Sequence, residues 1–406
     1  MPGSIRIPME PQTRQLPVAD WDPLDPAALA DPFAAHARLR DKCPVARADR
    51  WGGFWTLMRH EDVIAAALDP ETFISGEKTT IPDSTGADRP PRPPLEVDRP
   101  EHTHYRRLLA PYFSPERARQ LEPSIRRIAG DLIDAAVAER ECDLVPAVAL
   151  PMPALVLCEV LGLPAEDWSF LKRWTTEVIE AGRAGASERH ARANDAMYSY
   201  VHSVVEGRRT AGLDPAVDII TGLLELVVDG RQLDDGQVTG VVRLLLQAGH
   251  NTTTNGLGSS FRYLGAATAE QTRLREDPSL IPAAVDEILR AFSPAQFLAR
   301  TVTREVEVSG RTLCPGDKVG LSWASANRDP EAFPHPDRVD LARAPNRHVA
   351  FGYGIHRCLG AHLARVEMCV ALEELLARTT RFELIGPAPE IGWPHIGPRS
   401  VPVRLH

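Results

Sequence analysis

The stretch FGYGIHRCLGAHLAR, residues 351–365, places Cys358 between glycines at the start of a predicted helix. A thiol at a helix N-terminus lies near the positive end of the helix dipole and near unpaired N–H groups, and both favour the thiolate. The thiolate is the form that binds a soft metal ion or haem iron. Gly352, Gly354 and Gly360 allow tight turns and the close approach of a flat ligand. The stretch therefore predicts either a ligand-binding thiolate or a buried structural cysteine.

The composition bounds the class of protein. The 406-residue chain is 43% hydrophobic and 25% charged, which is ordinary for a globular protein. Its formal net charge of -9 argues against nucleic acid as the main partner, because phosphate binding needs concentrated Lys and Arg. No apolar run approaches the roughly 20 residues that span a bilayer, and the N-terminus lacks a signal-peptide core. The scattered cysteines, without a CxxC pair, predict a reducing, cytoplasmic location.

Apolar periodicity predicts a mainly α-helical chain with a minor β part. Three helices are predicted clearly, over 115–139, from about 235 to 268, and over 280–292. Alternation of apolar and polar residues over 299–323 predicts a short β region. Asp234, with glutamine three residues later, predicts a capping box at the start of the second helix.

The chain shows no internal repeat and no flexible linker. We therefore predict one domain over 1–406, with a folded core over 20–406 and a flexible N-terminal segment over 1–19. Prolines crowd the stretch 82–100, which predicts a long irregular loop, and such loops usually serve a function.

The cysteine stretch resembles the haem-binding loop of the cytochrome P-450 monooxygenases, in which a phenylalanine lies seven residues before the proximal cysteine. Phe351 and Cys358 have this spacing. The resemblance implies that Cys358 is the axial ligand of the iron of haem b, where electron donation from sulfur favours O–O cleavage. It implies that Phe351, Gly352 and Gly360 lie against the haem. The implied fold is a triangular helical prism, with haem between the long central helix and the cysteine-loop helix.

A zinc site at His356, Cys358 and His362 is the alternative for this stretch. Structural zinc usually takes four ligands from paired clusters, and the sequence has no second cluster. The zinc alternative is therefore the weaker interpretation.

The sequence EILR contains Glu287 and Arg290, which lie three apart and share one face of a predicted helix. Taken alone, the pair predicts an ordinary surface ion pair. About 70 residues before the cysteine loop, it resembles the ExxR motif of the family, whose buried pair joins a third arginine. Arg343 is the expected third member and Arg338 the second choice. Buried charges of this kind need full pairing, so their implied role is folding and haem retention.

The stretch LLLQAGHNTTTNG, 244–256, lies in the middle of the long predicted helix. The Thr252 hydroxyl can bond to the carbonyl of Ala248 and open that turn of the helix. A helix kink that serves packing alone is the alternative interpretation of this stretch. In the family this place holds dioxygen, which implies that Ala248 and Gly249 lie at the haem and that Thr252 helps deliver protons. The usual acid is replaced by Asn251, and an amide cannot relay a proton as a carboxylate does. Water, Thr253, His250 or a substrate group would then take part.

Haem carries two propionates that need cationic partners, and Arg suits carboxylates because it binds them in bidentate fashion. The stretch PEHTHYRRLLAPYF, 100–113, resembles the family helix that supplies a His and an Arg four apart. The resemblance implies that His102, Arg106, Arg300 and His356 bind the propionates, with His104 as an additional imidazole on the same stretch.

The resemblance implies a monooxygenase that uses dioxygen and two electrons to hydroxylate, demethylate, epoxidise or couple a small organic substrate. The chain has no flavin domain and no iron–sulfur ligand cluster, so we expect electrons from a ferredoxin and its ferredoxin reductase. An acidic partner of this kind would dock on arginines around the cysteine loop, namely Arg106, Arg107, Arg357 and Arg365. We expect a monomer.

The implied substrate pocket is formed by the 78–98 loop, the long helix and the segment after the ExxR helix. Its expected residues are Gln247, Ala248, Ala295, Gln296, Phe297 and Leu298. The amide of Gln247 suggests an aromatic or secondary-metabolite substrate that carries a hydrogen-bonding group. Two other classes stay open: a non-catalytic haem-thiolate sensor or carrier, which Asn251 favours, and a peroxide-driven haem enzyme, which Thr252 disfavours.

Overall fold

The computed structural model describes residues 18–82, 91–184, 186–228 and 230–406. Of the predicted N-terminal segment 1–19, all but the last two residues lie outside the described residues. Most of the first half of the proline-rich loop, residues 83–90, also lies outside them.

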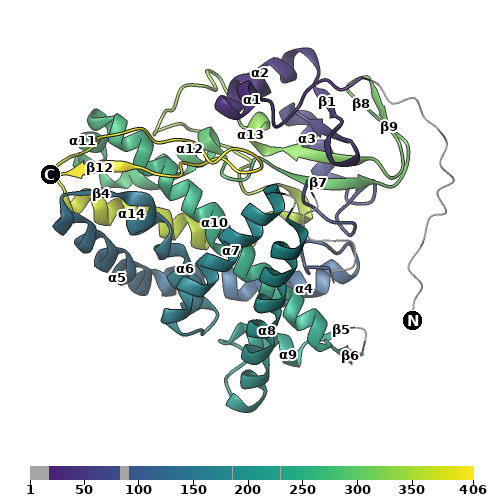
Figure 1. Cartoon of the computed structure of the whole chain (residues 1–406), viewed down its shortest axis with the longest axis horizontal. Coiled ribbons are helices and arrows are strands. Elements are labelled where there is room, and N and C mark those ends of the chain that lie inside the picture. Colours follow the sequence, from purple (N-terminus) through teal and green to yellow (C-terminus); the bar gives the residue numbers. More distant parts are fainter. Residues whose placement is uncertain (1–17, 83–90, 185, 229) are drawn as a thin grey trace.

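Helices make up most of the described chain, and the prediction of a mainly α fold with a minor β part is confirmed (Figure 1). None of the described helices is long and apolar enough to cross a membrane. The α-helices are α1 Pro26–Ala30, α2 Pro32–Lys42, α3 His60–Leu68, α4 Glu101–Leu109, α5 Pro115–Glu139, α6 Pro151–Val160, α7 Trp168–Ala184, α8 Ser187–Ala211, α9 Ile219–Glu225, α10 Asp235–Ala266, α11 Thr268–Glu276, α12 Ile281–Phe292, α13 Trp323–Ala326 and α14 Ala361–Arg378.

The strands form small sheets at the edge of the helical body. They are β1 Val45–Ala48, β2 Phe54–Leu57, β3 Phe73–Ile74, β4 Glu141–Asp143, β5 Val227–Val228, β6 Arg231–Gln232, β7 Phe297–Val302, β8 Val306–Val308, β9 Arg311–Leu313, β10 Lys318–Ser322, β11 Phe382–Leu384 and β12 Pro402–Leu405. The largest described sheet has the order β1-β2-β10-β7-β3 and is antiparallel except between β10 and β2. It fixes β7, whose first residues reach the functional cavity described below.

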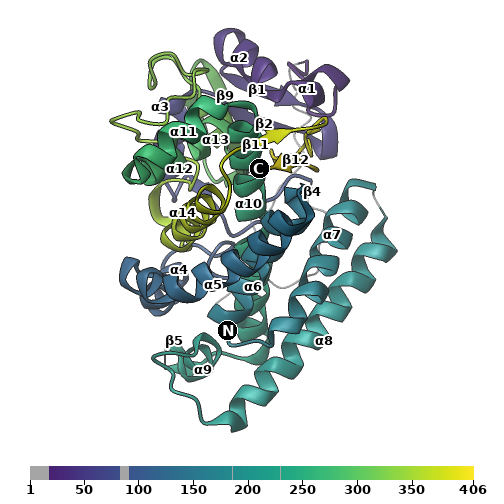
Figure 2. The ribbon, with the colours of Figure 1, turned by 90° about the vertical axis from the view of Figure 1, so that its left-hand side faces the viewer.

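Helix α10 lies at the centre of the molecule and packs against α6, α8, α12 and α14 (Figures 1 and 2). Its start is fixed by the predicted capping box: Gln237 N donates to Asp234 Oδ1 (2.8 Å), and Asp234 N donates to Gln237 Oε1 (3.0 Å). Most of its side chains are buried, as expected for a helix that is covered on several sides. Because it is packed on several sides, α10 is held in place as a wall on which side chains can be positioned.

The other predicted elements agree closely with the structure. α5 matches the predicted helix at both ends, and α12 begins one residue later than predicted. α12 stops where Ser293 adopts a left-handed conformation (φ 40°) before Pro294. In α14, Leu363 and Val370 are buried, whereas Val366 is only partly buried.

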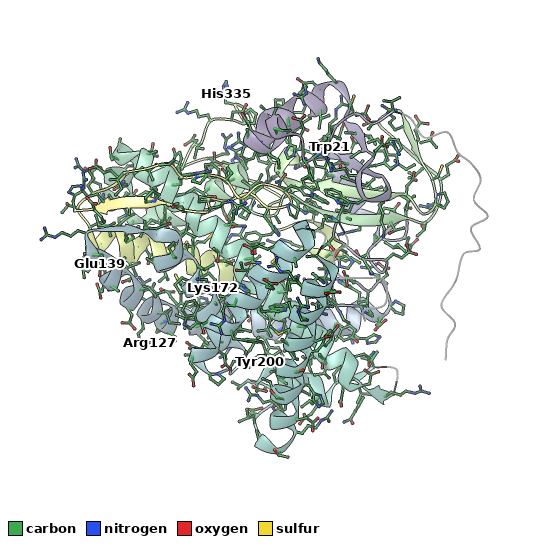
Figure 3. The ribbon with its side chains drawn as sticks, viewed as in Figure 1. Trp21, Arg127, Glu139, Lys172, Tyr200 and His335 are labelled. Carbon is green, nitrogen blue, oxygen red and sulfur yellow. The ribbon has the colours of Figure 1, made fainter. Side chains whose placement is uncertain are left out.

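An aromatic cluster joins the N-terminal part of the chain to the C-terminal loop. Trp21, labelled in Figure 3 beside the purple N-terminal helices, packs edge-on against Trp393, with ring centroids 5.7 Å apart. Trp393 in turn stacks on Phe297 of β7 at 4.5 Å. Such pairs add stability beyond their buried area, so the cluster fixes one side of the functional cavity.

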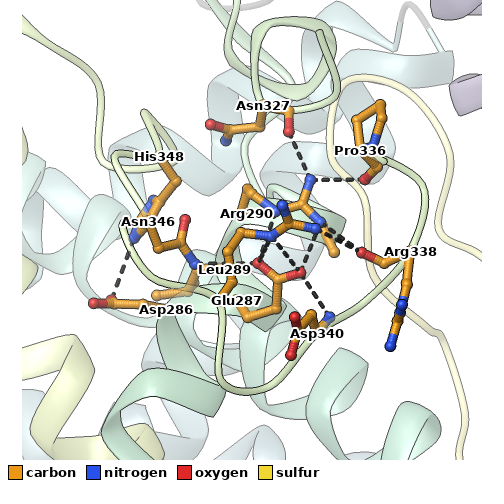
Figure 4. A network of polar contacts seen from close by, with 12 residues as sticks. Asp286, Glu287, Leu289, Arg290, Asn327, Pro336, Arg338, Asp340, Asn346 and His348 are labelled. Atoms are coloured by element: carbon orange, nitrogen blue, oxygen red, sulfur yellow. Dashed lines mark hydrogen bonds and ion pairs between the residues drawn. The ribbon is translucent and has the colours of Figure 1, made fainter. Parts of the chain in front are cut away.

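A buried ionic network holds the segment that leads to the cysteine loop (Figure 4). Glu287 and Arg290 of α12 are both fully buried and form a bidentate pair at 2.7 and 2.8 Å. The remaining donors of Arg290 bond to the backbone carbonyls of Asn327, Pro336 and Arg338. Since every donor has a partner, the cost of burying the charge is offset and the segment 327–338 is fixed on α12.

Arg343, the expected third member, donates its Nε to both oxygens of Glu287 at 3.1 Å. Arg338, the second choice, contributes only its backbone carbonyl, which accepts from Arg343 and Arg290. Asn346 Nδ2 also donates to Glu287, at 3.1 Å, a contact that sequence reasoning missed. Burial opposes ionisation, but the bonds from Arg290, the Asp340 N–H and Arg343 hold the pKa of Glu287 below its usual value.

We expect Glu287→Gln to lower the free energy of unfolding by about 3–5 kcal/mol, because it leaves Arg290 as an uncompensated buried charge. The neighbouring Asp286, whose side chain is 31% exposed, is the matched control, and Asp286→Asn should cost about 1 kcal/mol or less. Urea denaturation followed by circular dichroism measures both. Equal losses for the two variants would contradict the role given to the network.

Candidate active site

A cavity of about 870 Å³ lies beside the cysteine turn, within the usual size range of ligand pockets. Its walls come from α4, α10, the start of β7, the cysteine turn, α14 and the C-terminal loop. Residues from both ends of the described chain, from Leu24 to Arg399, thus meet in one place. Nearly all the residues expected to bind a cofactor or substrate lie on its walls.

The cysteine turn is shaped by two left-handed glycines. Gly352 and Gly354 both have φ of 70°, and a side chain at Gly354 would clash with the backbone of Ala67 in α3. The turn is closed by the Cys358 N–H, which donates to the Phe351 carbonyl at 2.7 Å. Gly360 precedes α14 and has open space where a side chain would project, which leaves room for a flat ligand.

The sulfur of Cys358 is exposed to the cavity, which it lines. Burial within the protein raises the pKa of the thiol, and the Gly360 N–H, Arg106, Arg357 and Arg365 oppose that shift only in part. The expectation that the turn alone favours the thiolate is therefore wrong, because desolvation has the larger effect. A thiolate at this place calls for a positive charge in direct contact with the sulfur, as a bound metal ion would supply.

Helix α10 supplies Gln247, Ala248, Gly249, Thr252 and Thr253 to the cavity wall. Thr252 Oγ1 donates to the Ala248 carbonyl, as expected, but the distance of 3.4 Å is long for a hydrogen bond. The helix nevertheless runs without a break through this turn, so the expected opening at Ala248 is not present. The space for a small ligand is provided by the cavity rather than by an unwound turn.

Two polar residues of α10 that were candidates for proton transfer point elsewhere. Asn251 is partly exposed and is not among the described residues that line the cavity. His250 is buried and its Nδ1 bonds to the Leu246 carbonyl at 2.9 Å. Burial lowers the pKa of His250 to about 4, so its imidazole is neutral at pH 7.

Cationic and imidazole groups gather at one edge of the cavity. His102 and Arg106 come from α4, Arg300 from β7 and His356 from the cysteine turn. The two imidazole rings lie 4.4 Å apart, and the Nε2 atom of each is buried without a hydrogen-bond partner. His104 does not line the cavity, which leaves His102 as the imidazole of this helix that faces it.

Burial governs the ionisation of these groups. Desolvation lowers the pKa of Arg300 to about 10 and that of Arg106 below its usual value. Burial, with the nearby arginines, lowers the pKa of His102 to about 4 and that of His356 to about 2. Two carboxylates at this edge would give the orphaned donors partners and restore the charged forms. The edge therefore fits the two propionates of a haem.

The remaining wall is mostly apolar. Ala295, Phe297 and Leu298 line the cavity as expected. Gln296 does not, because its side-chain amide donates to the His395 carbonyl at 3.2 Å. The expected loop contributes Thr79, Pro82, Pro94 and other residues, whereas 83–90 lie outside the described residues.

Trp51, Trp393 and Glu367 are among the wall residues that were missed from the sequence. Trp51 lies in a three-residue 3-10 helix and Trp393 in a loop, and neither segment has a local pattern that points to the cavity. Glu367 of α14 is buried, its Oε2 has no partner among the described residues, and burial raises its pKa well above the usual value. The sequence does contain a signal for Glu367, because it places an acidic residue among the apolar residues of α14. Across the described residues, no group of three or more His, Cys, Asp or Glu could hold a metal ion, which excludes the zinc alternative.

The family model described as cytochrome P-450 matches residues 183–385. Cytochrome P-450 107B1 of Saccharopolyspora erythraea is 35% identical, over 93% of this chain and 94% of its own length. The chain belongs to the cytochrome P-450 family. Similarity also extends to vitamin D(3) 25-hydroxylase of Pseudonocardia autotrophica, which is 36% identical over 86% of each chain.

The fold agrees with the same assignment. The crystal structure of CYP109E1 from Bacillus megaterium in complex with testosterone superposes with a TM-score of 0.85 at 29% identity, covering 94% of this chain and 99% of that one. As a cytochrome P-450, the protein is a monooxygenase that binds haem b. The thiol, the open space at Gly360 and the orphaned donors at the cavity edge all fit that group.

We expect Arg300→Leu to weaken haem binding by about 10- to 100-fold, the effect of losing one charge-assisted hydrogen bond. Arg304, whose side chain is 67% exposed, is the matched control on the same chain segment, and Arg304→Leu should leave haem binding unchanged. Haem transfer to excess apomyoglobin, followed by absorbance, gives the dissociation rates. An Arg300→Leu protein that retains haem as long as the unaltered protein would contradict the assignment.

Proposed function

We propose that this cytochrome P-450 inserts one oxygen atom of dioxygen into a small organic substrate, with two electrons supplied by a ferredoxin and its ferredoxin reductase. The observation that carries the proposal is a cavity with Cys358 on one wall, the Thr252 turn of α10 on another and four cationic or imidazole residues at its edge. We also propose that the protein acts as a single-domain, cytoplasmic monomer.

Each wall has a proposed role in holding the haem. Cys358 would supply the thiolate that holds the iron, and its neighbours Phe351, Gly352 and Gly360, with Ala248 and Gly249 of α10, would contact the haem. His102, Arg106, Arg300 and His356 would bind the propionates. Once bound, haem supplies the activation of dioxygen, and the protein positions the substrate and excludes water.

Proton delivery falls to groups that face the cavity. Thr252 holds a proton at Oγ1, and because its bond to the Ala248 carbonyl is long, at 3.4 Å, the hydroxyl can turn to donate into the cavity. The Thr253 hydroxyl lies on the same wall, and Glu367 holds a proton at its buried carboxyl group. Because Asn251 lies off the wall, we propose that these groups and water replace the usual acid.

The substrate is proposed to be a mainly apolar compound, of the aromatic or secondary-metabolite type. Phe297, Leu298 and Trp393 give the cavity apolar and aromatic walls, and Gln247 adds one amide. The relatives support a mainly apolar substrate, since one is named as a hydroxylase of vitamin D3 and another was crystallised with testosterone.

The proposed electron donor would dock near the cysteine turn. Arg107 and Arg357 are exposed there and are available to an acidic partner. Two other expected members are less available: Arg106 is only partly exposed and is assigned to a propionate, and Arg365 pairs with Asp286 and stacks on Phe351. Arg357 also lines the cavity but is exposed. The docking face is therefore proposed to rest on Arg107 and Arg357.

The function is tested by supplying ferredoxin, its reductase, NADH and labelled dioxygen, together with the compound that shifts the ferric haem most strongly to high spin in a screen. We expect NADH consumption that depends on the compound and a product that carries one labelled oxygen atom. Binding without turnover would favour the sensor or carrier, and a product formed only with peroxide would favour the peroxide-driven enzyme; either result overturns the proposal.

Two variants of α10 separate proton delivery from packing in the same assay. Thr252→Ala should lower the product formed per NADH by about tenfold or more, because it removes a general acid from the cavity wall. Thr254 lies two residues after Thr252, is buried and does not line the cavity. Thr254→Ala, which removes a hydroxyl away from the cavity wall, should therefore leave this ratio unchanged. Asn251→Asp should also have little effect, and equal ratios for Thr252→Ala and the unaltered enzyme would contradict the role of Thr252.

A further inference from the structure

Gln247 is the one amide side chain that the α10 wall offers to the cavity among the described residues. Its Oε1 is already occupied, because it accepts a hydrogen bond of 2.7 Å from NH1 of Arg92. Its Nε2 has no hydrogen-bond partner within the part of the chain that the structure describes. The Nε2 end of this amide is therefore available to donate to a ligand, whereas the Oε1 end is occupied by Arg92.

Arg92 is itself held in place by Glu96, four residues later. The guanidinium Nε and NH2 groups donate to the two carboxylate oxygens at 3.1 and 2.6 Å, and the Arg92 N–H donates to the same carboxylate at 3.1 Å. Both residues are buried, with exposures of 3% and 2%. A buried pair with this bidentate geometry fixes the direction of the remaining NH1 group, which points at Gln247.

The pair also fixes which way the amide of Gln247 faces. If the amide were reversed, its NH2 group would face the NH1 donor of Arg92, and two donors cannot bond to each other. The favourable orientation directs Oε1 to Arg92 and leaves the two protons of Nε2 for the cavity. Arg92 is not among the described residues that line the cavity, so it acts on a ligand only through Gln247.

We infer that Gln247 is a specificity-determining residue that acts only as a hydrogen-bond donor, so the substrate presents an oxygen acceptor, such as a ketone, lactone or ether, to this part of α10. Arg92 and Glu96 are positioning residues for that contact. The inference rests on the proposed function, since it concerns the substrate of the same cavity.

The surroundings of Gln247 strengthen the selection. Leu244, Leu245 and Ala248 are its neighbours on the α10 wall, and Pro94 and Leu95 come from the loop that carries Arg92 and Glu96. In such an apolar setting, binding loses free energy when the Nε2 group of Gln247 faces an apolar part of the substrate, because that donor is then unpaired. Binding also loses free energy when a hydrogen-bond donor of the substrate faces Nε2. An acceptor oxygen thus selects both the compound and its orientation, because Gln247 immediately precedes Ala248 on the proposed haem-facing wall.

The test uses three bicyclic probes of similar size with the haem-loaded protein: indane, which has no polar atom, 1-indanone, which has one acceptor, and indole, which has one donor. Dissociation constants come from the shift of the ferric haem absorption toward high spin. We expect 1-indanone to bind about 3- to 10-fold more tightly than indane, the effect of one net hydrogen bond, and indole to bind no more tightly than indane. Equal binding of indane and 1-indanone, or preference for indole, would overturn the inference.

Variants show whether the preference arises at Gln247. Gln247→Leu should reduce the ratio of the indane and 1-indanone dissociation constants to about one, and the isosteric Gln247→Glu, whose carboxylate is an acceptor, should shift the preference toward indole. The double variant Arg92→Met/Glu96→Met should also reduce the ratio without leaving a buried charge. Arg192→Met, at an exposed i,i+4 pair with Glu188, is the control and should keep the ratio.

The outcomes separate this inference from the proposed function. A protein that binds haem, shows the expected probe preference and yields no product would contradict the proposed function alone. A protein that turns over substrate but binds the three probes equally would contradict only the donor role of Gln247. If the ratio survives in both Gln247 variants, the donor is another residue and the inference is wrong.

Discussion

The surroundings of the Cys358 sulfur, which faces the cavity inside the protein, set the constraint on which the site depends. In the protein alone, desolvation raises the pKa of the thiol, and the helix terminus and nearby arginines do not reverse this shift. The charged form required of an iron ligand thus gains its stability from the metal itself. This makes haem binding and thiolate formation a single coupled event, as expected when a ligand must lose a proton to bind.

Buried charges in this protein are of two kinds: those paired within the chain, which stabilise the fold, and those without a protein counter-ion, which are available to bind a ligand. Glu287 with Arg290 and Arg343, and Arg92 with Glu96, satisfy one another within the chain. Arg300 lies as deeply buried, yet its one hydrogen bond in the described structure goes to the neighbouring Ala299 carbonyl. A fold tolerates such a cation when a ligand supplies the missing anion, so the unsatisfied groups outline the edge of the haem site.

The sequence predicted the parts of the site that local patterns encode. The long helix with its capping box, the helix of Glu287 and Arg290, and the cysteine turn all have periodicity or characteristic spacing. Residues whose roles depend on long-range contacts could not be predicted. Trp393 is held at the cavity by packing against Phe297 and Trp21. Arg92 has a role in the site because it donates to Gln247, which lies 155 positions away in the sequence.

Some expectations failed because a tertiary effect exceeded a local one. Packing on several sides keeps α10 helical at Ala248, although a threonine hydroxyl competes for that carbonyl. Likewise, Gln296 bonds to the C-terminal loop rather than facing the cavity between Ala295 and Phe297. For Gln296, the partner that decides the side-chain direction is His395, far away in the chain, and for α10 it is the set of helices α6, α8, α12 and α14 packed around it.

The most direct test of the account is the absorption spectrum of the reduced protein under carbon monoxide, compared between the unaltered protein and Cys358→His. If sulfur of residue 358 binds the iron, the unaltered protein shows the red-shifted Soret band of a thiolate-bound haem, and the variant shows the band of an imidazole-bound haem. Identical bands in the two proteins would mean that Cys358 is not the iron ligand.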